Sequence, residues 1–201
     1  MKSYLLKLAV VGSISATLAG AAAGHEFTAA ILVTGQEREA RLAEAVNGFL
    51  LAADERDGHP NETSDGHLGG VDVQILPLPK EAAGRVSGLI GTPAQVPDVI
   101  VLIGDGSGAR PDEAMIDPVS AVLMPGTLPA DWSDDTRAES FAARYGSAYG
   151  TPPTETAAIG YNAARRLDLA IRPLDGTTPR AAFAAALDET ERGINWQGTD
   201  K

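Results

Sequence analysis

The sequence predicts an α/β fold in which a parallel sheet carries helices on both faces, in three layers. The segments with the composition of strands are short and mostly apolar, which is typical of strands covered on both sides. They alternate with longer segments whose apolar residues recur every three or four positions, the spacing of an amphipathic helix. Alternation of this kind favours parallel strands that are joined by helices.

Four segments are predicted strands. Val99–Ile103 is the clearest, because it is wholly apolar and stops at the glycine-rich turn Gly104–Gly108. Glycine or proline also closes the first and the last of the four segments. In chain order, the predicted strands are Phe27–Thr34, Val71–Leu78, Val99–Ile103 and Ser120–Met124.

Five segments are predicted helices. Ser133 is the expected N-cap of the third helix, and Pro179 suits the first turn of the last one. The charged residues of the first helix, from Glu37 to Glu44, are expected on its solvent side. The polar stretch Asp57–Gly70 is a predicted loop. The predicted helices cover residues 36–54, 80–90, 134–149, 153–171 and 179–190.

Residues 1–23 have the features of a secretory signal peptide. Lys2 and Lys7 supply positive charge, the stretch after them contains no charged residue, and it ends in small residues. It is shorter than the roughly 20 apolar residues of a membrane-spanning helix, and it is rich in Gly, Ser and Ala. The sequence therefore predicts export to the periplasm, with cleavage after Ala21 or Ala23.

The rest of the chain is long enough for one domain with an ordinary hydrophobic core, which we assign to residues 24–192, followed by a tail over 193–201. The chain has no cysteine, so no disulfide supports this fold. Aromatic residues make up only 5%, and alanine-rich helices must therefore pack closely. The net charge of −11 disfavours binding to nucleic acid or to anionic lipid, and no nucleic-acid partner is expected.

The sequence predicts no enzymatic activity and no cofactor. It has neither a Gly-x-Ser-x-Gly nucleophile turn nor a Walker phosphate loop, and its three histidines all precede residue 68. His59, Glu62, Asp65 and His67 crowd one loop, but their spacing matches no closed zinc pattern, so no metal site is predicted.

The C-terminal third carries motifs in a recognisable order. It resembles the C-terminal region of type I periplasmic binding proteins, the substrate-binding family of ABC importers for branched-chain amino acids. Where that family has Gly-Tyr-Asp-Ala, this chain has Asn162 in place of the aspartate. The motifs are Phe141-Ala-Ala-Arg-Tyr-Gly-Ser-Ala-Tyr-Gly150, Pro152-Pro-Thr154, Ala157-Ala-Ile-Gly-Tyr-Asn-Ala-Ala164 and Arg180-Ala-Ala-Phe-Ala-Ala-Ala-Leu187.

Members of that family have two lobes, whereas only residues 109–140 of this chain lie where the second lobe would be inserted. About 30 residues are too few for an independent lobe. The resemblance therefore implies a single lobe of a periplasmic binding protein.

The resemblance also implies a ligand site after the strand Val99–Ile103. Ser107 would bind the carboxylate of a small polar solute such as an amino acid, the glycines beside it would let backbone amides approach, and Tyr161 would add an aromatic contact. The implied ligand-binding residues are Asp105, Gly106, Ser107, Gly108 and Tyr161. The same residues also fit a capped strand-to-helix turn and, for Tyr161, the apolar core.

Two functions remain open at this point. The first is a solute-binding protein that works with the membrane subunits of an ABC transporter. Because one lobe cannot close over a ligand, a homodimer or another protein would supply the facing surface. The second is a degenerate accessory protein that uses this surface to bind another periplasmic protein instead of a solute.

Overall fold

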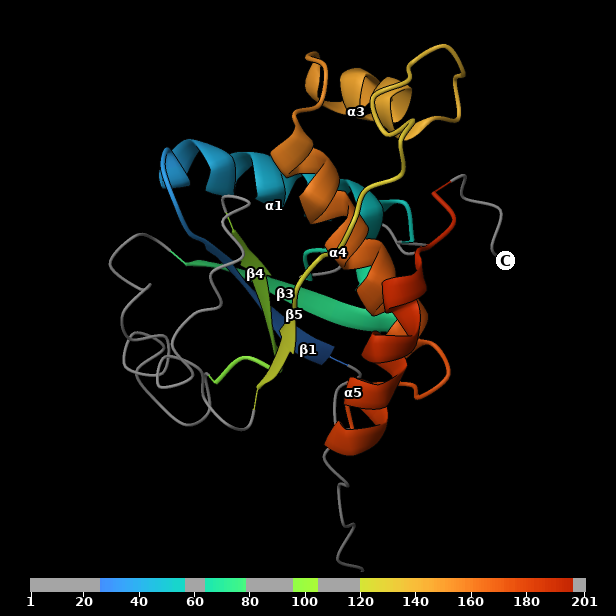
Figure 1. Cartoon of the computed structure of the whole chain (residues 1–201). Helices are drawn as coiled ribbons and strands as arrows, with labels where there is room; N and C mark the ends of the chain where they lie inside the picture. Colours follow the sequence, from blue (N-terminus) through green and yellow to red (C-terminus); the bar gives the residue numbers. More distant parts are fainter. Residues whose placement is uncertain (1–25, 57–63, 79–95, 105–119, 197–201) are drawn as a thin grey trace, which may run out of the picture.

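The structure is a computed structural model that describes residues 26–56, 64–78, 96–104 and 120–196. A five-stranded sheet forms its centre, in the order β2-β3-β1-β4-β5 (Figure 1). Four of the strands run parallel to one another, so the expected α/β class with a mainly parallel sheet is confirmed. The strands are β1 (Glu26–Val33), β2 (His67–Leu68), β3 (Val71–Leu78), β4 (Val99–Ile103) and β5 (Ala121–Leu123).

Strand β2 was not predicted, because its two residues lie inside a stretch with the composition of a loop. It pairs antiparallel with β3 through the tight turn at Gly69 and Gly70. Both glycines have positive φ angles, of 65° and 84°, which a side chain would disfavour. The imidazole Nε2 of His67 lies 2.7 Å from a carboxylate oxygen of Asp72 across this hairpin.

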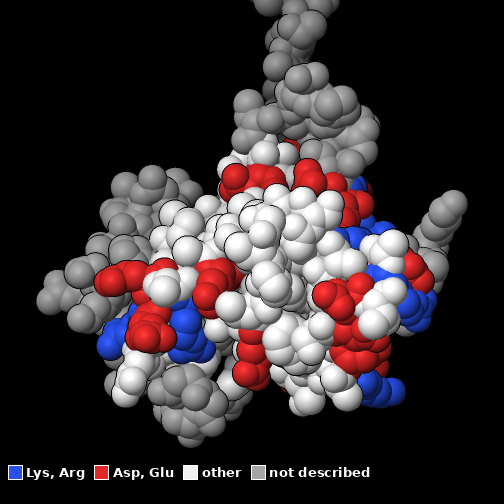
Figure 2. Space-filling view, turned by 90° about the horizontal axis from the view of Figure 1, so that it is seen from above, with Lys and Arg blue, Asp and Glu red and all other residues white. Residues whose placement is uncertain are grey.

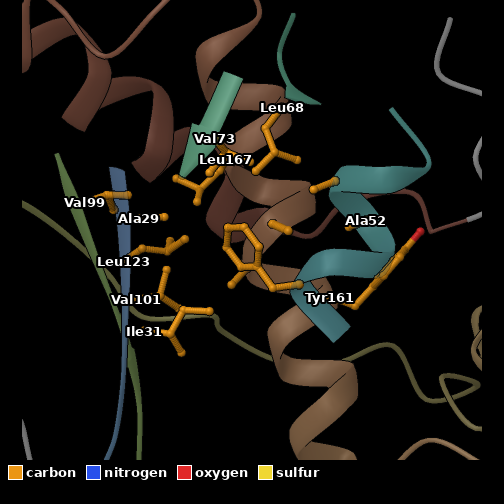
Figure 3. Packing of buried hydrophobic residues seen from close by; sticks show 14 of the residues in the cluster. Ala29, Ile31, Ala52, Leu68, Val73, Val99, Val101, Leu123, Tyr161 and Leu167 are labelled. Atoms are coloured by element: carbon orange, nitrogen blue, oxygen red, sulfur yellow. The ribbon is translucent and has the colours of Figure 1, made fainter. Parts of the chain in front are cut away.

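The described helices lie on the same side of the sheet, three of them against the strands and the helix at residues 141–149 on top of the other helices (Figure 1). Alternate strand residues such as Ala29, Ile31 and Val101 point into the core beneath them (Figure 3). The residues between, such as Leu32 and Ile100, belong to the other face and are also buried. Helical cover is thus confirmed for one face, and the predicted helix 80–90 lies outside the described residues. The helices are α1 (Arg38–Asp54), α3 (Phe141–Tyr149), α4 (Glu155–Ile171) and α5 (Arg180–Glu189), followed by the 3-10 turn Thr190–Arg192.

Helix α3 begins seven residues later than the sequence predicted. The segment before it forms turns, in which the Asp134 carboxylate accepts a hydrogen bond of 2.9 Å from the backbone N–H of Thr136. The N-cap of the helix is Ser140, whose hydroxyl accepts a hydrogen bond from the N–H of Ala143. The expected cap at Ser133 was therefore wrong, because an aspartate side chain favours a local turn over a helix.

Helices α1 and α4 cross with their backbones in direct contact. A methyl group added at Gly48 would lie 1.8 Å from the carbonyl oxygen of Ala157. One added at Gly160 would lie 2.0 Å from the carbonyl oxygen of Ala45. Both distances are far below any atomic contact, so only glycine fits at either position. The close packing expected of alanine-rich helices is confirmed at this crossing.

Buried polar side chains of α4 hold segments that lie before and after it in the chain. Arg166 donates to the carbonyl oxygens of Met124 and Leu187, at 2.5 and 3.1 Å. Asn162 donates to the carbonyl oxygen of Pro125 and accepts from the indole N–H of Trp196 at 3.0 Å. Trp196 belongs to the segment that the sequence placed in a tail, but its side chain is buried in the core.

The α1–α4 crossing is tested by adding one methyl group. Gly48→Ala is expected to lower the free energy of unfolding by about 3 kcal/mol, because the new methyl group forces the two backbones apart. Gly146→Ala is the matched control, since its added methyl group would lie 3.9 Å from the nearest atom. Alanine should raise stability there by about 0.5–1 kcal/mol. Urea unfolding of both variants measures the difference, and equal values would contradict the crossing.

Candidate functional site

An open cleft of about 570 Å³ lies where β1 and β4 end. The residues after β1, the residue after β4 and the first turn of α4 form its walls. Its volume falls in the range of small-molecule sites, which is roughly 300–1,000 Å³. The lining residues are Gln36, Glu37, Arg41, Gly104, Glu155, Thr156 and Ile159.

The cleft lies at the point where the chain reverses its direction across the sheet. From β1 the chain passes through α1 to β3 on one side, whereas β4 and β5 lie on the other side of β1. The strand that follows β1 and the strand that follows β4 therefore lie on opposite sides of this pair. A crevice opens at such a point in an open α/β sheet, and ligands of these folds bind there.

Arg41 ties the two strand ends together from the first turn of α1. Its guanidinium donates to the carbonyl oxygen of Thr34 at 2.8 Å and to that of Gly104 at 2.6 Å. Its Nε lies 3.4 Å from the hydroxyl of Thr156 at the start of α4. Three acceptors from three segments thus hold the cation in place, with its charge at the wall of the cleft.

Two carboxylates accompany Arg41 in the cleft. Glu155 lies in the first turn of α4, and Glu37 directly precedes α1. Glu37 has a left-handed backbone, with φ of 50° and ψ of 35°, and its side chain does not cap the helix. A left-handed backbone costs free energy for a glutamate, and residues held in this way cluster at functional sites, although Asp175 adopts it in a turn outside the cleft.

Of the ligand-binding residues implied by the resemblance, Asp105 to Gly108 lie outside the described residues. They follow directly on Gly104, which lines the cleft. Tyr161 does not line the cleft. Its side chain is fully buried, and its ring centroid lies 4.7 Å from that of Phe141 and 5.1 Å from that of Trp196.

The hydroxyl of Tyr161 points away from the sheet (Figure 3) and joins a partly buried polar cluster. It donates to a carboxylate oxygen of Glu55 at 2.9 Å and accepts from Arg144 at 3.0 Å. Arg144 also forms an ion pair with Glu55 and donates to the carbonyl oxygen of Trp196. Burial raises the pKa of Tyr161, so this phenol stays protonated at neutral pH. The cluster joins α1, α3, α4 and the C-terminal segment.

Sequence reasoning missed Arg41, Glu37 and Glu155 as site residues, because charged residues at helical spacing are usually solvated. Their position in the sequence could have indicated a site, because the first turn of a helix that follows a central strand lies at the carboxyl edge of the sheet. In the loop with two histidines, His59 and Glu62 lie outside the described residues. In the part of the chain that the structure describes, no three metal-binding side chains come together.

Comparison with protein-family models, with curated proteins and with solved structures finds no match to this chain. Among the helices within the described residues, none has the length and apolar character needed to cross a bilayer.

The position of Tyr161 gives a prediction about both stability and binding. Tyr161→Phe removes the hydroxyl between Arg144 and Glu55, and we expect it to lower the free energy of unfolding by about 1–2 kcal/mol. It should leave solute binding at the cleft unchanged, because the ring lies in the core. Thermal unfolding with and without solute measures both effects. A stable variant that no longer responds to solute would show that Tyr161 contacts the ligand.

Proposed function

We propose that this protein is an exported, non-catalytic solute-binding protein of the periplasm. The observation that carries the proposal is the strand-end cleft, which lies at the switch point of a parallel sheet and holds a fixed guanidinium beside two carboxylates. Its volume suits a small solute. In this proposal it takes the role of the substrate-binding component of an ABC importer, as the resemblance of residues 141–187 implies.

The charges of the cleft favour a solute that carries both a positive and a negative charge. Arg41 and Glu37 present opposite charges from the start of α1, and Glu155 presents a negative charge from the first turn of α4. A zwitterionic solute such as an amino acid complements this arrangement, with its carboxylate near Arg41 and its ammonium group near a glutamate. A purely anionic solute would be repelled by the two carboxylates.

The left-handed backbone of Glu37 supports ligand binding at the carboxyl edge of the sheet. A left-handed glutamate costs on the order of 1 kcal/mol that a glycine would not. The side chain does not compensate for this cost by capping α1. A carboxylate held over the cleft at the expense of stability is expected where that carboxylate serves a ligand.

The cleft is open, so one lobe binds only weakly by itself. Sites that bury most of a ligand gain affinity from contacts on all sides. In this proposal a second copy of the chain, or the membrane subunits of a transporter, supplies the facing surface. The acidic surface then restricts partners to those without strong negative charge.

A second candidate is an accessory protein that binds another periplasmic protein. One observation favours it. Val122 and Met124 are each 40% exposed and are the exposed large apolar side chains among the described residues. They lie on and beside β5, an edge strand of the described sheet, and edge strands can pair with another chain.

The test measures the thermal unfolding midpoint of the purified protein against a panel of amino acids and short carboxylates. A solute that binds the folded state raises the midpoint in a concentration-dependent way. Glu37→Gln should reduce this response by removing one charge while keeping the backbone strain. Glu39→Gln, a charge change of the same kind that lies outside the cleft, should respond like the wild type.

Glu37→Gly separates stability from binding. It should raise the midpoint without solute by about 2–4 °C, because glycine adopts the left-handed backbone without strain. It should also lose the response to solute. Ser107→Ala should weaken the response too, if the turn after β4 contacts the ligand. The proposal is wrong if no solute stabilises the protein at millimolar concentration, and such a result would favour the accessory protein.

A further inference from the structure

A second, smaller cavity of about 70 Å³ lies between the turns before α3 and the C-terminal segment. It shares no lining residue with the strand-end cleft. The chain has two tryptophans, Trp132 and Trp196, and both of them line this cavity. The lining residues are Pro129, Asp131, Trp132, Asp134, Arg137, Glu139, Ser140, Phe141 and Trp196.

Contacts with the rest of the protein fix the aromatic rings that line the cavity. Trp196 donates its indole N–H to Asn162 at 3.0 Å, which leaves its ring, and not its N–H, for a ligand. Its ring meets Phe141 nearly edge-on, with the centroids 5.1 Å apart. Trp132 is half-buried and packs against the core. Trp132, Phe141 and Trp196 therefore present aromatic ring surface to the cavity, and such surface attracts cations.

The rim of the cavity is acidic. Asp131, Asp134 and Glu139 are exposed carboxylates, and Arg137 is the single cation among the lining residues. Arg137 pairs with Glu139, with its Nη2 at 2.7 Å from the carboxylate. The rim thus carries an excess of two negative charges. On the face that carries α3, acidic and basic side chains lie together on both sides of an uncharged middle (Figure 2).

Two of these carboxylates stay ionised below neutral pH. The backbone N–H of Thr136 lowers the pKa of Asp134, because it donates a hydrogen bond to the charged form. The pKa of Glu139 is lowered by a backbone N–H of its own residue and by Arg137. An anionic ligand would therefore meet fixed negative charge across the usual range of pH.

We propose that this cavity binds an alkylated ammonium group, such as the trimethylammonium head of a small solute or of a modified lysine side chain. Aromatic rings and carboxylates together recognise this chemistry, because the charge is spread over methyl groups that are poorly hydrated. A cavity of about 150 Å³ takes a ligand the size of benzene, so this cavity of about 70 Å³ admits one or two methyl groups and leaves the rest of the head group at its open, acidic rim. An inorganic cation would instead need a shell of oxygen ligands.

Tryptophan fluorescence reports on this cavity alone, because both tryptophans of the chain line it. The full protein is titrated with tetramethylammonium and with choline at constant ionic strength. We expect a saturable change in fluorescence with a dissociation constant in the millimolar range or below. 3,3-dimethylbutanol has the shape of choline without its charge, and it should bind at least about tenfold more weakly if the charge is recognised by the rings and the rim.

Variants assign the effect to the cavity. Trp132→Leu should weaken binding about tenfold, with Trp196 remaining as the reporter, whereas Trp132→Phe should retain part of it. Asp131→Asn should weaken binding severalfold by removing one rim charge. Asp135→Asn is the matched control, because Asp135 is exposed nearby but does not line the cavity. The thermal midpoint of each variant checks that it folds.

Two further results decide the proposal. A fluorescence change that does not saturate, or that is as large with 3,3-dimethylbutanol as with choline, would overturn it. Equal binding by Trp132→Leu and the wild type would overturn it as well. If binding is confirmed, a peptide with trimethyllysine distinguishes the two sources of the group. Binding about tenfold tighter than that of tetramethylammonium indicates a modified protein chain, and equal or weaker binding indicates a small solute.

Discussion

At the centre of the fold, α1 and α4 touch backbone to backbone. Gly48 lies against the carbonyl of Ala157, and Gly160 lies against the carbonyl of Ala45, in a reciprocal contact that leaves no room for a side chain. The first turns of both helices reach the edge where β1 and β4 end, and there Arg41 bridges them to the strands. The crossing thus joins the two helices whose first turns form walls of the strand-end cleft.

The same helix α4 also organises the chain that follows the sheet. Its buried Asn162 and Arg166 bind the backbone after β5 and the C-terminal segment, and its Tyr161 joins Glu55 to Arg144. Helix α4 therefore contributes to two sites. Its first turn forms part of the cleft, and its Asn162 holds Trp196, which lines the aromatic cavity. Polar groups are tolerated in this interior because each of these side chains has hydrogen-bond partners.

The apolar strands and most helices were predictable, because burial on both faces and helical spacing leave a clear pattern in sequence. The start of α3 was not, since an aspartate at residue 134 can cap a helix or close a turn, and spacing alone does not decide between them. Arg41 was missed for a similar reason. A charged residue on a helix is usually solvated, and only the fold shows that this one faces two strand ends. Tyr161 had two interpretations in the sequence, and the structure places it in the core.

Hydrogen exchange with and without solute tests the central claim most directly. That claim is that the α1–α4 crossing forms a solute site at the ends of β1 and β4. Exchange is measured by mass spectrometry on the wild-type protein, with the solute that gives the largest thermal stabilisation. Slower exchange is expected in peptides that cover Thr34–Arg41 and Glu155–Ile159, with no change over Asp131–Phe141. Protection confined to other parts of the chain, or none at all, would contradict the account.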